Sequence, residues 1–204
     1  MEQPLVIPSG DTAGLVRLSA RLHEELLVRG APERGVVFAC IGTDRSSGVA
    51  LGPVGGQLLA RGGCTPDEGI GTLEEPLHAL NLAERLGPVV ELDPRPVVVA
   101  VDAALGPLAG VGSIRVRDGG LRPGQGVGKD LPEIGELSVT ATVNVATGLL
   151  EAQVLQSTRL WLVQGLADTI GVACWWGLRR ARRDAEELLL AEAQAAGTAE
   201  AAAA

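Results

Sequence analysis

The pattern of hydrophobic and polar residues along the chain predicts four main strands. Two uninterrupted apolar runs, 36–41 and 97–101, are typical of strands that are covered on both faces, and Asp102 ends the second. Residues 112–117 and 137–144 instead alternate between apolar and polar, which indicates strands with one wetter face. The first two strands are therefore predicted to lie inside the protein.

Helical spacing of apolar residues accounts for most of the remaining chain. Leucines recur every three or four positions over 11–29, and Asp11 is the predicted N-cap of this helix. Further elements are predicted as helices at 50–61, 77–86, 149–176 and 178–195 and as a short strand at 70–72. Alternating helices and strands favour a single α/β domain over 1–195, with a mostly parallel sheet between helices. The Ala/Glu-rich tail 196–204 is predicted to be disordered.

Composition limits what can fill the core. Hydrophobic residues make up 46% of the 204 residues and aromatic residues only 2%, so valine, leucine, alanine and isoleucine must dominate. A domain of this length buries roughly 70% of its unfolded surface, and so needs no disulfide or metal to fold. The three cysteines are far apart and include no C-x-x-C pair, which indicates a reducing compartment and no zinc site.

Charge and hydropathy exclude two classes of partner. A net charge of −8 argues against nucleic-acid binding, which needs a basic face. Four arginines cluster at 179–183, and three of them are predicted to pair with acidic residues at i+4: Arg180 with Asp184, Arg182 with Glu186 and Arg183 with Glu187. The N-terminus has no signal-peptide pattern, and polar residues interrupt the apolar stretch 149–176, so no membrane segment is predicted. We therefore expect a cytoplasmic protein.

Two aspartates follow the two apolar runs. Ligands of parallel sheets bind beyond the carboxyl ends of the strands, which is where Asp102 and Asp44 are predicted to lie. Partial burial would raise the pKa of Asp102 and suit it to acid–base or metal chemistry, whereas the alternative is a turn cap. Asp44 lies in a glycine-bounded loop, 42–48, where an aspartate can equally serve as a turn former.

Segment 71–82 is denser in polar residues than its surroundings. His78 and Asn81 are three apart and would share a helical face. Glu74 and Glu75, together with His78, could supply metal ligands alongside Asp102. The alternative is a helix N-terminus that carries acidic residues. A divalent-metal hydrolase therefore stays open as one hypothesis for the function, although no resident cofactor is predicted.

Other catalytic motifs are absent from the sequence. No G-x-S-x-G elbow or Ser/His/Asp order occurs, and the chain has only two histidines. Residues 124–130 superficially match a phosphate-binding loop, but the spacing is one residue short and Asp130 stands where a hydroxyl is required. Nucleotide binding through this loop is rejected.

Five segments, in one order, resemble the YyaC-type sporulation proteins. They are CIGTDRSSGVALGP at 40–53, GTLEEPLHALNL at 71–82, VVVAVDAALG at 97–106, LRPGQGVGKDLPEIGELSVTATVNV at 121–145 and VLQSTRLWLV at 154–163. The resemblance spans roughly 36–176 and is highly specific. That family is similar to the germination protease, and more distantly to the hydrogenase-maturation endopeptidases.

The resemblance implies a fold and a function. The fold is a phosphorylase/hydrolase-like three-layer α/β sandwich. The activity is that of a carboxylate-dependent endopeptidase acting in the forespore on peptides or proteins, with small acid-soluble spore proteins as the expected substrate. Asp102 and Asp44 are the predicted catalytic residues. The predicted substrate-binding residues are Thr43, Arg45, Glu75, His78, Asn81, Lys129 and Asn144.

One position departs from the related peptidases. Their second carboxylate stands two residues before the Leu-Gly-Pro turn, and this chain has Val49 there. Two close carboxylates can share a proton and so provide an acid and a base together. The replacement leaves two hypotheses open: a weakened peptidase in which Asp44 is the partner of Asp102, or a non-catalytic binding or assembly module that retains the fold.

The tryptophans raise the question of self-association. Trp161, Trp175 and Trp176 are the only ones in the chain. Indole rings favour interfaces, which predicts a homo-oligomer. The alternative is that they fill the core.

Overall fold

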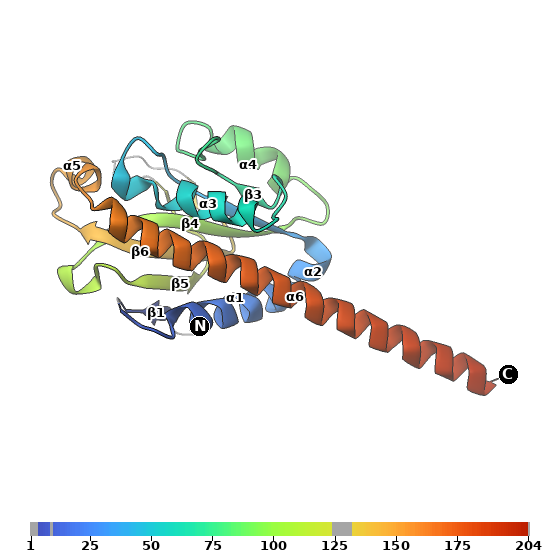
Figure 1. The fold of residues 1–204 in the computed structure, drawn as a ribbon. Coiled ribbons are helices and arrows are strands. Elements are labelled where there is room, and N and C mark those ends of the chain that lie inside the picture. Colours follow the sequence, from blue (N-terminus) through green and yellow to red (C-terminus); the bar gives the residue numbers. More distant parts are fainter. Residues whose placement is uncertain (1–3, 9, 124–131, 204) are drawn as a thin grey trace.

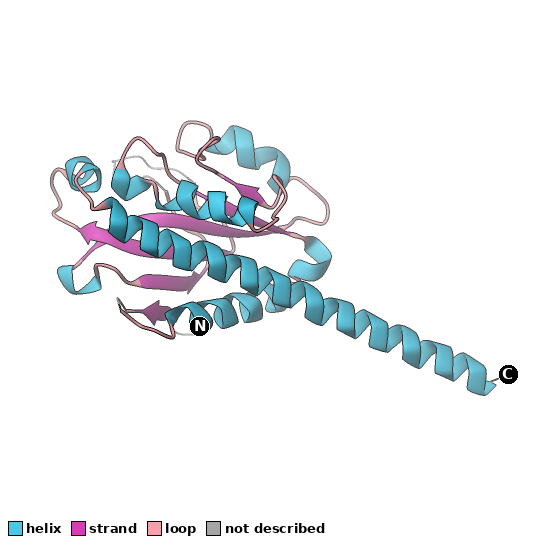
Figure 2. Cartoon of the chain, in the orientation of Figure 1, coloured by secondary structure: helices cyan, strands magenta, loops and turns pink. Residues whose placement is uncertain are grey.

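A computed structural model describes residues 4–8, 10–123 and 132–203. The described strands form one six-stranded sheet in the order β1-β5-β6-β4-β2-β3 (Figures 1 and 2). They are β1 (Leu5–Ile7), β2 (Val36–Cys40), β3 (Gly69–Ile70), β4 (Val97–Gly106), β5 (Ile114–Asp118) and β6 (Leu137–Val145). Neighbours from β3 through β6 are parallel, whereas β5 and β1 pair antiparallel at one edge.

Helices cover both faces of this sheet. They are α1 (Gly14–Val28), α2 (Ala31–Arg34), α3 (Leu51–Arg61), α4 (Leu82–Val90), α5 (Glu151–Gln156) and α6 (Leu160–Ala203), with single 3-10 turns η1 (Ser47–Val49) and η2 (Leu108–Gly110). On one face, α6 crosses the sheet between α1 and α3 (Figure 1). Leucines of α4 pack on the opposite face. The predicted three-layer α/β sandwich with a mostly parallel sheet is confirmed.

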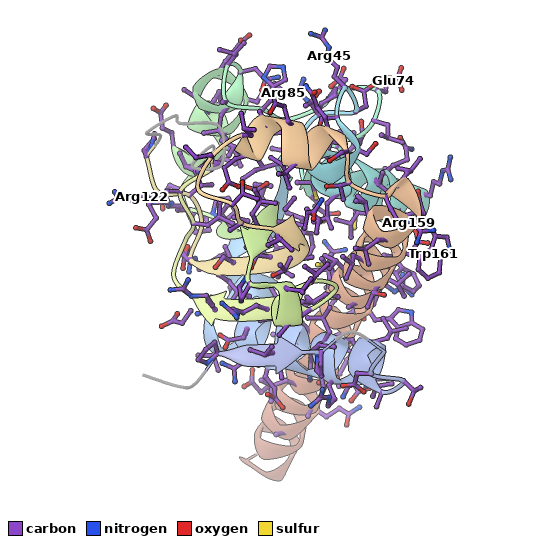
Figure 3. The ribbon with its side chains drawn as sticks, turned by 90° about the vertical axis from the view of Figure 1, so that its left-hand side faces the viewer. Arg45, Glu74, Arg85, Arg122, Arg159 and Trp161 are labelled. Carbon is purple, nitrogen blue, oxygen red and sulfur yellow. The ribbon has the colours of Figure 1, made fainter. Side chains whose placement is uncertain are left out.

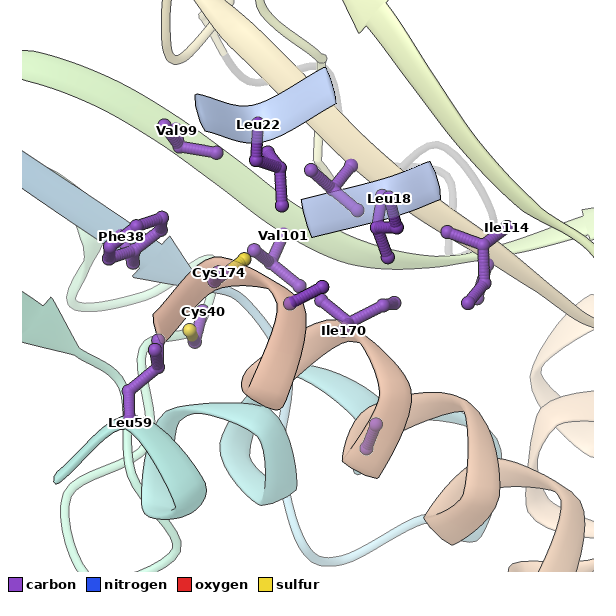
Figure 4. Packing of buried hydrophobic residues seen from close by; sticks show 14 of the residues in the cluster. Leu18, Leu22, Phe38, Cys40, Leu59, Val99, Val101, Ile114, Ile170 and Cys174 are labelled. Atoms are coloured by element: carbon purple, nitrogen blue, oxygen red, sulfur yellow. The ribbon is translucent and has the colours of Figure 1, made fainter. Parts of the chain in front are cut away.

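The larger part of the core lies between the sheet and α1, α3 and α6. Val99 and Val101 of β4 point into it together with Leu22 of α1 and Ile170 of α6 (Figure 4). Each of these side chains is at most 1% exposed. Full burial of such a side chain contributes about 1.5–3 kcal/mol, so aliphatic side chains hold this layer to the sheet, and Phe38 is the only fully buried aromatic residue among those described.

Strand β4 is longer than predicted, and this moves Asp102 to a new place. The strand continues to Gly106 because residues 102–106 pair with 140–145 of β6, with one irregularity after Ala104. Asp102 therefore lies inside a strand and does not end it. The apolar run ends where the covering layer on that face ends, and the hydrogen-bonded ladder continues.

The C-terminal helices also divide differently from the prediction. The predicted helix 149–176 is interrupted after Gln156, and α6 then runs without a break past Gly177. Gly177 does not end the helix, because it is the point where α6 meets α1. A Cβ there would lie 2.9 Å from the Leu22 Cβ. The structure describes the backbone of 196–203 as the end of α6, and the predicted disorder of the tail stays a prediction.

Two helices begin later in the chain than predicted. The first helix begins at Gly14, because Asp11 accepts a hydrogen bond from the Ala13 N–H in a turn ahead of the helix and does not cap it. Helix α4 begins at Leu82, because Asn81 holds the preceding residues in a turn. Both misplacements come from polar side chains that bond to nearby backbone groups.

The predictions about cysteines and membrane segments can be compared with the structure. All three cysteines are free and buried, and burial raises the pKa of the Cys40 thiol to about 12. They therefore act as small core residues. Within the described part of the chain, no helix combines the length and the apolar character that crossing a bilayer requires.

Candidate functional site

Asp102 lies on the side of the sheet that the large core does not use. Alternate residues of a strand point to opposite faces, so Asp102 shares its face with Val98 and Ala100, which pack in the smaller core with α4. Beyond Ala100 that core ends. Asp102 is consequently partly buried and lines two adjoining cavities, together with Val49 and Leu155.

The smaller cavity has a volume of about 260 Å³. It brings together the three regions predicted to form the site, which are the loop 42–48, the segment 71–82 and Asp102. Its polar lining comes from the loop after β2, the turn before α4, the middle of β4 and the end of α5: Thr43, Ser46, His78, Asp102 and Gln156. Asp102 is the only carboxyl group among its described lining residues. The rest of the wall is mostly apolar, and Val49 belongs to it.

The environment of Asp102 changes its acidity. Removal from water disfavours the charged form and raises the pKa of this carboxyl to about 7. The Ala103 N–H donates a hydrogen bond to Asp102 Oδ1 at 2.8 Å, which opposes the rise. Because its pKa is close to neutrality, Asp102 can both accept and release a proton at physiological pH.

A glycine turn places Val49 in this wall. Gly42 has φ +152°, and a Cβ there would lie 2.0 Å from the Val49 carbonyl oxygen. The Thr43 N–H donates to the same oxygen at 3.2 Å, so the loop closes back on Val49. Asp44 and Arg45 are both exposed and line neither cavity. Figure 3 shows Arg45 on the outside of the molecule. The structure therefore brings Val49, and not Asp44, beside Asp102.

The turn before α4 presents His78 to the cavity. Asn81 Oδ1 accepts the His78 N–H at 2.8 Å, and Asn81 Nδ2 donates to the Pro76 carbonyl at 2.9 Å. The Leu80 N–H donates to His78 Nδ1 at 3.3 Å, which leaves Nε2 to carry the proton in the neutral ring. Asn81 thus positions His78, and its own amide is engaged within the turn.

Two other predicted binding residues, Glu75 and Asn144, do not line the cavities beside Asp102. Glu75 is exposed and pairs with Arg85 at 2.8 Å. Asn144 Nδ2 donates to Val154 O and Thr158 Oγ1 at 3.2 and 3.1 Å, which fixes the end of α5 next to β6. Lys129 lies outside the described residues.

The described residues around Asp102 include no cluster that could bind a metal ion. Among the described residues, no group of three His, Cys, Asp or Glu side chains is placed to hold an ion. Glu74 is exposed at the tip of its turn, on the outside of the molecule (Figure 3). The metal-dependent hypothesis stays a prediction, which metal analysis of the purified protein would test.

The larger cavity, of about 610 Å³, includes residues that sequence reasoning missed. Arg115 and Arg117 of β5 and Ser138 and Thr140 of β6 form its sheet side, next to Asp102. A signal for them was present, because 112–117 and 137–144 were both predicted to have a wetter face. The pattern could not predict that β5 pairs with β6. This pairing places the polar faces of the two strands on the same side of the sheet.

Two of the three tryptophans are exposed, and the third packs against the edge of the large core. Trp161 is 80% exposed and Trp176 41%, whereas the partly buried Trp175 donates its indole N–H to the Gly62 carbonyl at 2.6 Å. The core-filling alternative is thus excluded for Trp161 and Trp176, and the homo-oligomer stays a prediction.

Comparison with known proteins places the whole site inside one family. A family model described as a protein of unknown function, DUF1256, matches residues 9–173, which include every described residue that lines the two cavities beside Asp102. The uncharacterized protein YyaC of Bacillus subtilis (strain 168) is 42% identical over 160 residues, an alignment that covers 78% of this chain and 77% of that protein. The resemblance found in the sequence is confirmed at this level: the chain belongs to the DUF1256 family and is a YyaC-type protein.

Proposed function

We propose that this protein is a spore-protease-like endopeptidase of the forespore, in which Asp102 is the principal catalytic carboxyl group. One observation carries the proposal: a partly buried carboxyl with a pKa near 7 stands in the wall between two cavities at the C-terminal side of a parallel sheet. Perturbed carboxyls in cavities are typical of catalytic acids and bases.

The chemistry requires one group to move a proton twice. Ionised Asp102 takes a proton from a water molecule as the water oxygen attacks the peptide carbonyl. The resulting carboxylic acid then gives that proton to the leaving amine, and the C–N bond breaks. His78 and Ser46 supply hydrogen-bond donors on the same cavity wall. The Ser46 Oγ is buried and has no partner among the described residues, so it is available to a bound carbonyl.

The activity is expected to be slow. Val49 leaves the smaller cavity with one carboxyl group, so Asp102 must act first as base and then as acid without a second carboxylate to share the proton. The exposed Asp44 would have to move inward to replace that partner.

Cleavage of small acid-soluble spore proteins tests the proposal. Wild-type protein should cleave them slowly, at a rate that rises with pH through about 7 as Asp102 ionises. Asp102→Asn should reduce the rate by about 10²- to 10⁴-fold, the usual contribution of general acid–base catalysis. Mass spectrometry of the fragments identifies the bond. Equal cleavage by both proteins would remove Asp102 from the mechanism.

Val49 favours a second candidate, a binding or assembly module without catalysis. The Val49→Asp variant separates the two functions, because it restores a second carboxyl beside Asp102. A faster cleavage by Val49→Asp than by the wild type supports a weakened peptidase. If neither protein cleaves, while the wild type binds the same spore proteins tightly in calorimetry, the binding module is the function.

A further inference from the structure

Half of the sheet face that carries Asp102 has no helix over it among the described elements. The smaller core, built from α4 and the turn before it, covers β2, β3 and the first part of β4. On the other half, Ile114 and Val116 of β5 point into the large core, so Arg115 and Arg117 point to the opposite face. There they line the larger cavity with Asp102.

The two arginines have no side-chain partner among the described residues. Both are exposed, and neither guanidinium makes an ion pair or hydrogen bond with the residues that the structure describes. Arg34 and Arg85, in contrast, pair with Glu136 and Glu75. Two neighbouring guanidinium groups without a partner among the described residues, in a chain of net charge −8, can bind an anionic ligand.

The remaining charges of the cavity leave this anion site open. Arg122 adds a third positive charge at the outer edge (Figure 3). Of the three carboxyls in the lining, Asp118 is engaged with Arg29, which lies outside the cavity, at 2.6 Å. Glu133 and Asp102 are then the two carboxyls that oppose the three arginines. Within the described lining, positive charge therefore exceeds negative charge.

Strand pairing gives the distance from the arginines to Asp102. Asp102 pairs with Thr140, and Thr140 pairs with Arg115, so the three residues form one row across neighbouring strands. Adjacent strands lie about 4.8 Å apart, which puts the Cα atoms of Asp102 and Arg115 about 10 Å apart. An extended peptide rises about 3.3 Å per residue and covers this distance in about three residues.

We propose that Arg115 and Arg117 form a subsite for the carboxylate of an acidic side chain, about three residues from the peptide bond that lies at Asp102. The inference rests on the proposed function for its choice of a peptide ligand. Arginine suits this role because its planar fork binds a carboxylate with two parallel hydrogen bonds. Thr140 lies between the two sites and can contact the peptide backbone.

A peptide offers carboxylates of two kinds, a side chain and a C-terminus, and calorimetry with three decapeptides separates them. The first is acetylated and amidated and carries one glutamate among alanines. The second has glutamine in its place. The third has that glutamine and a free C-terminal carboxylate. Wild-type protein should bind the first peptide at least tenfold more tightly than the second or the third.

Matched variants assign the effect to the two arginines. Arg115→Gln/Arg117→Gln should bind the glutamate peptide no better than the glutamine peptide. Arg159→Gln/Arg180→Gln removes the same charge from exposed arginines outside the cavity and should keep the tenfold preference. Arg115→Lys/Arg117→Lys retains the charge without the planar fork and should keep only part of the preference.

The outcomes distinguish the subsite from the peptidase. Equal affinity of the wild type for the glutamate and glutamine peptides would overturn the subsite. An equal loss of the glutamate preference in Arg115→Gln/Arg117→Gln and in the control Arg159→Gln/Arg180→Gln would also overturn it. Preference for the free C-terminus would overturn its assignment to a side chain. A glutamate preference that needs both arginines, in a protein that cleaves nothing, would retain the subsite and reject the peptidase.

Discussion

At the scale of single residues, the candidate site depends on where along β4 the smaller core stops covering the strand. Val98, Ala100 and Asp102 occupy successive positions on one face of β4, yet the first two lie in the smaller core and the third faces two cavities. At this position the Asp102 carboxyl is shielded from most water and is still accessible to a ligand in the cavities. This combination gives Asp102 its raised pKa.

A consequence for stability follows from that pKa. In the unfolded chain Asp102 titrates near 3.9, and in the folded protein at about 7. Between these values the folded protein holds a proton that the unfolded chain has lost. The stability that this group contributes is therefore complete below pH 4 and is lost as the pH rises through 7. At about 1.4 kcal/mol per pKa unit, the loss is about 4 kcal/mol at most.

Chemical denaturation of the wild type and Asp102→Asn between pH 4 and 8 measures this loss. Asparagine cannot ionise, so the variant should gain stability relative to the wild type as the pH rises and should match it near pH 4. Asp44→Asn, at an exposed position, serves as the control and should follow the wild type. Parallel curves for Asp102→Asn and the wild type would show that the carboxyl is not desolvated.

At the scale of elements, glycines set how closely α3 approaches the sheet. A Cβ on Gly52 would lie 2.1 Å from the Ile41 carbonyl oxygen, and one on Gly56 would lie 2.2 Å from that of Gly71. Helix and strands can therefore touch backbone to backbone. This contact fixes the loop between β2 and α3, which carries Thr43, Ser46 and Val49 to the smaller cavity.

Two alanine substitutions in the same helix should have opposite effects. Gly56→Ala must push α3 away from Gly71 and should cost about 1–3 kcal/mol of unfolding free energy, as overpacking does. At Gly55 the nearest atom to an added Cβ is 3.8 Å away, so Gly55→Ala should stabilise the protein by about 0.5–1 kcal/mol through helix propensity. Thermal unfolding of both variants provides the comparison, and similar effects at the two sites would contradict the close approach of α3.

The elements also show what the sequence could and could not reveal. Apolar runs located β2 and β4 because burial on both faces leaves a direct trace in composition. Asp102 was found for the same reason, as the first polar residue after such a run. The extension of β4 to Gly106 and the placement of Arg115 depend on pairing with β6, a contact between distant segments that no local pattern encodes.

Side-chain direction accounts for the remaining differences at the site. Asn81 and Asn144 are polar and stand next to the expected site, yet their amides bond to backbone groups and hold the turn before α4 and the end of α5. Residue type and sequence neighbourhood identified the region. They could not tell a group that contacts a ligand from one that positions its neighbour.

At the scale of the whole molecule, the described chain consists of a packed body and one helix, α6, that extends beyond it. Helix α6 crosses the sheet and continues well beyond the body (Figure 1). Leu178 and Ala181 are still buried, and His23 Nε2 contacts Asp184 Oδ2 at 2.7 Å. Further along, Leu188, Leu189 and Leu190 are each more than 60% exposed. The described body thus stops supporting α6 between Asp184 and Leu188.

Two leucines of α6, ten residues apart, should therefore differ sharply in their effect on stability. Leu178→Ala removes a side chain that is 3% exposed and should cost about 2–5 kcal/mol of unfolding free energy, the usual range for a core leucine. Leu188→Ala removes one that is 62% exposed and should change that free energy by about 0.5 kcal/mol or less. Urea unfolding at several protein concentrations measures both values. A large cost for Leu188→Ala that grows with protein concentration would mean that a second copy covers the end of α6, as the predicted homo-oligomer would require, whereas a large cost at every concentration would contradict the boundary between body and free helix.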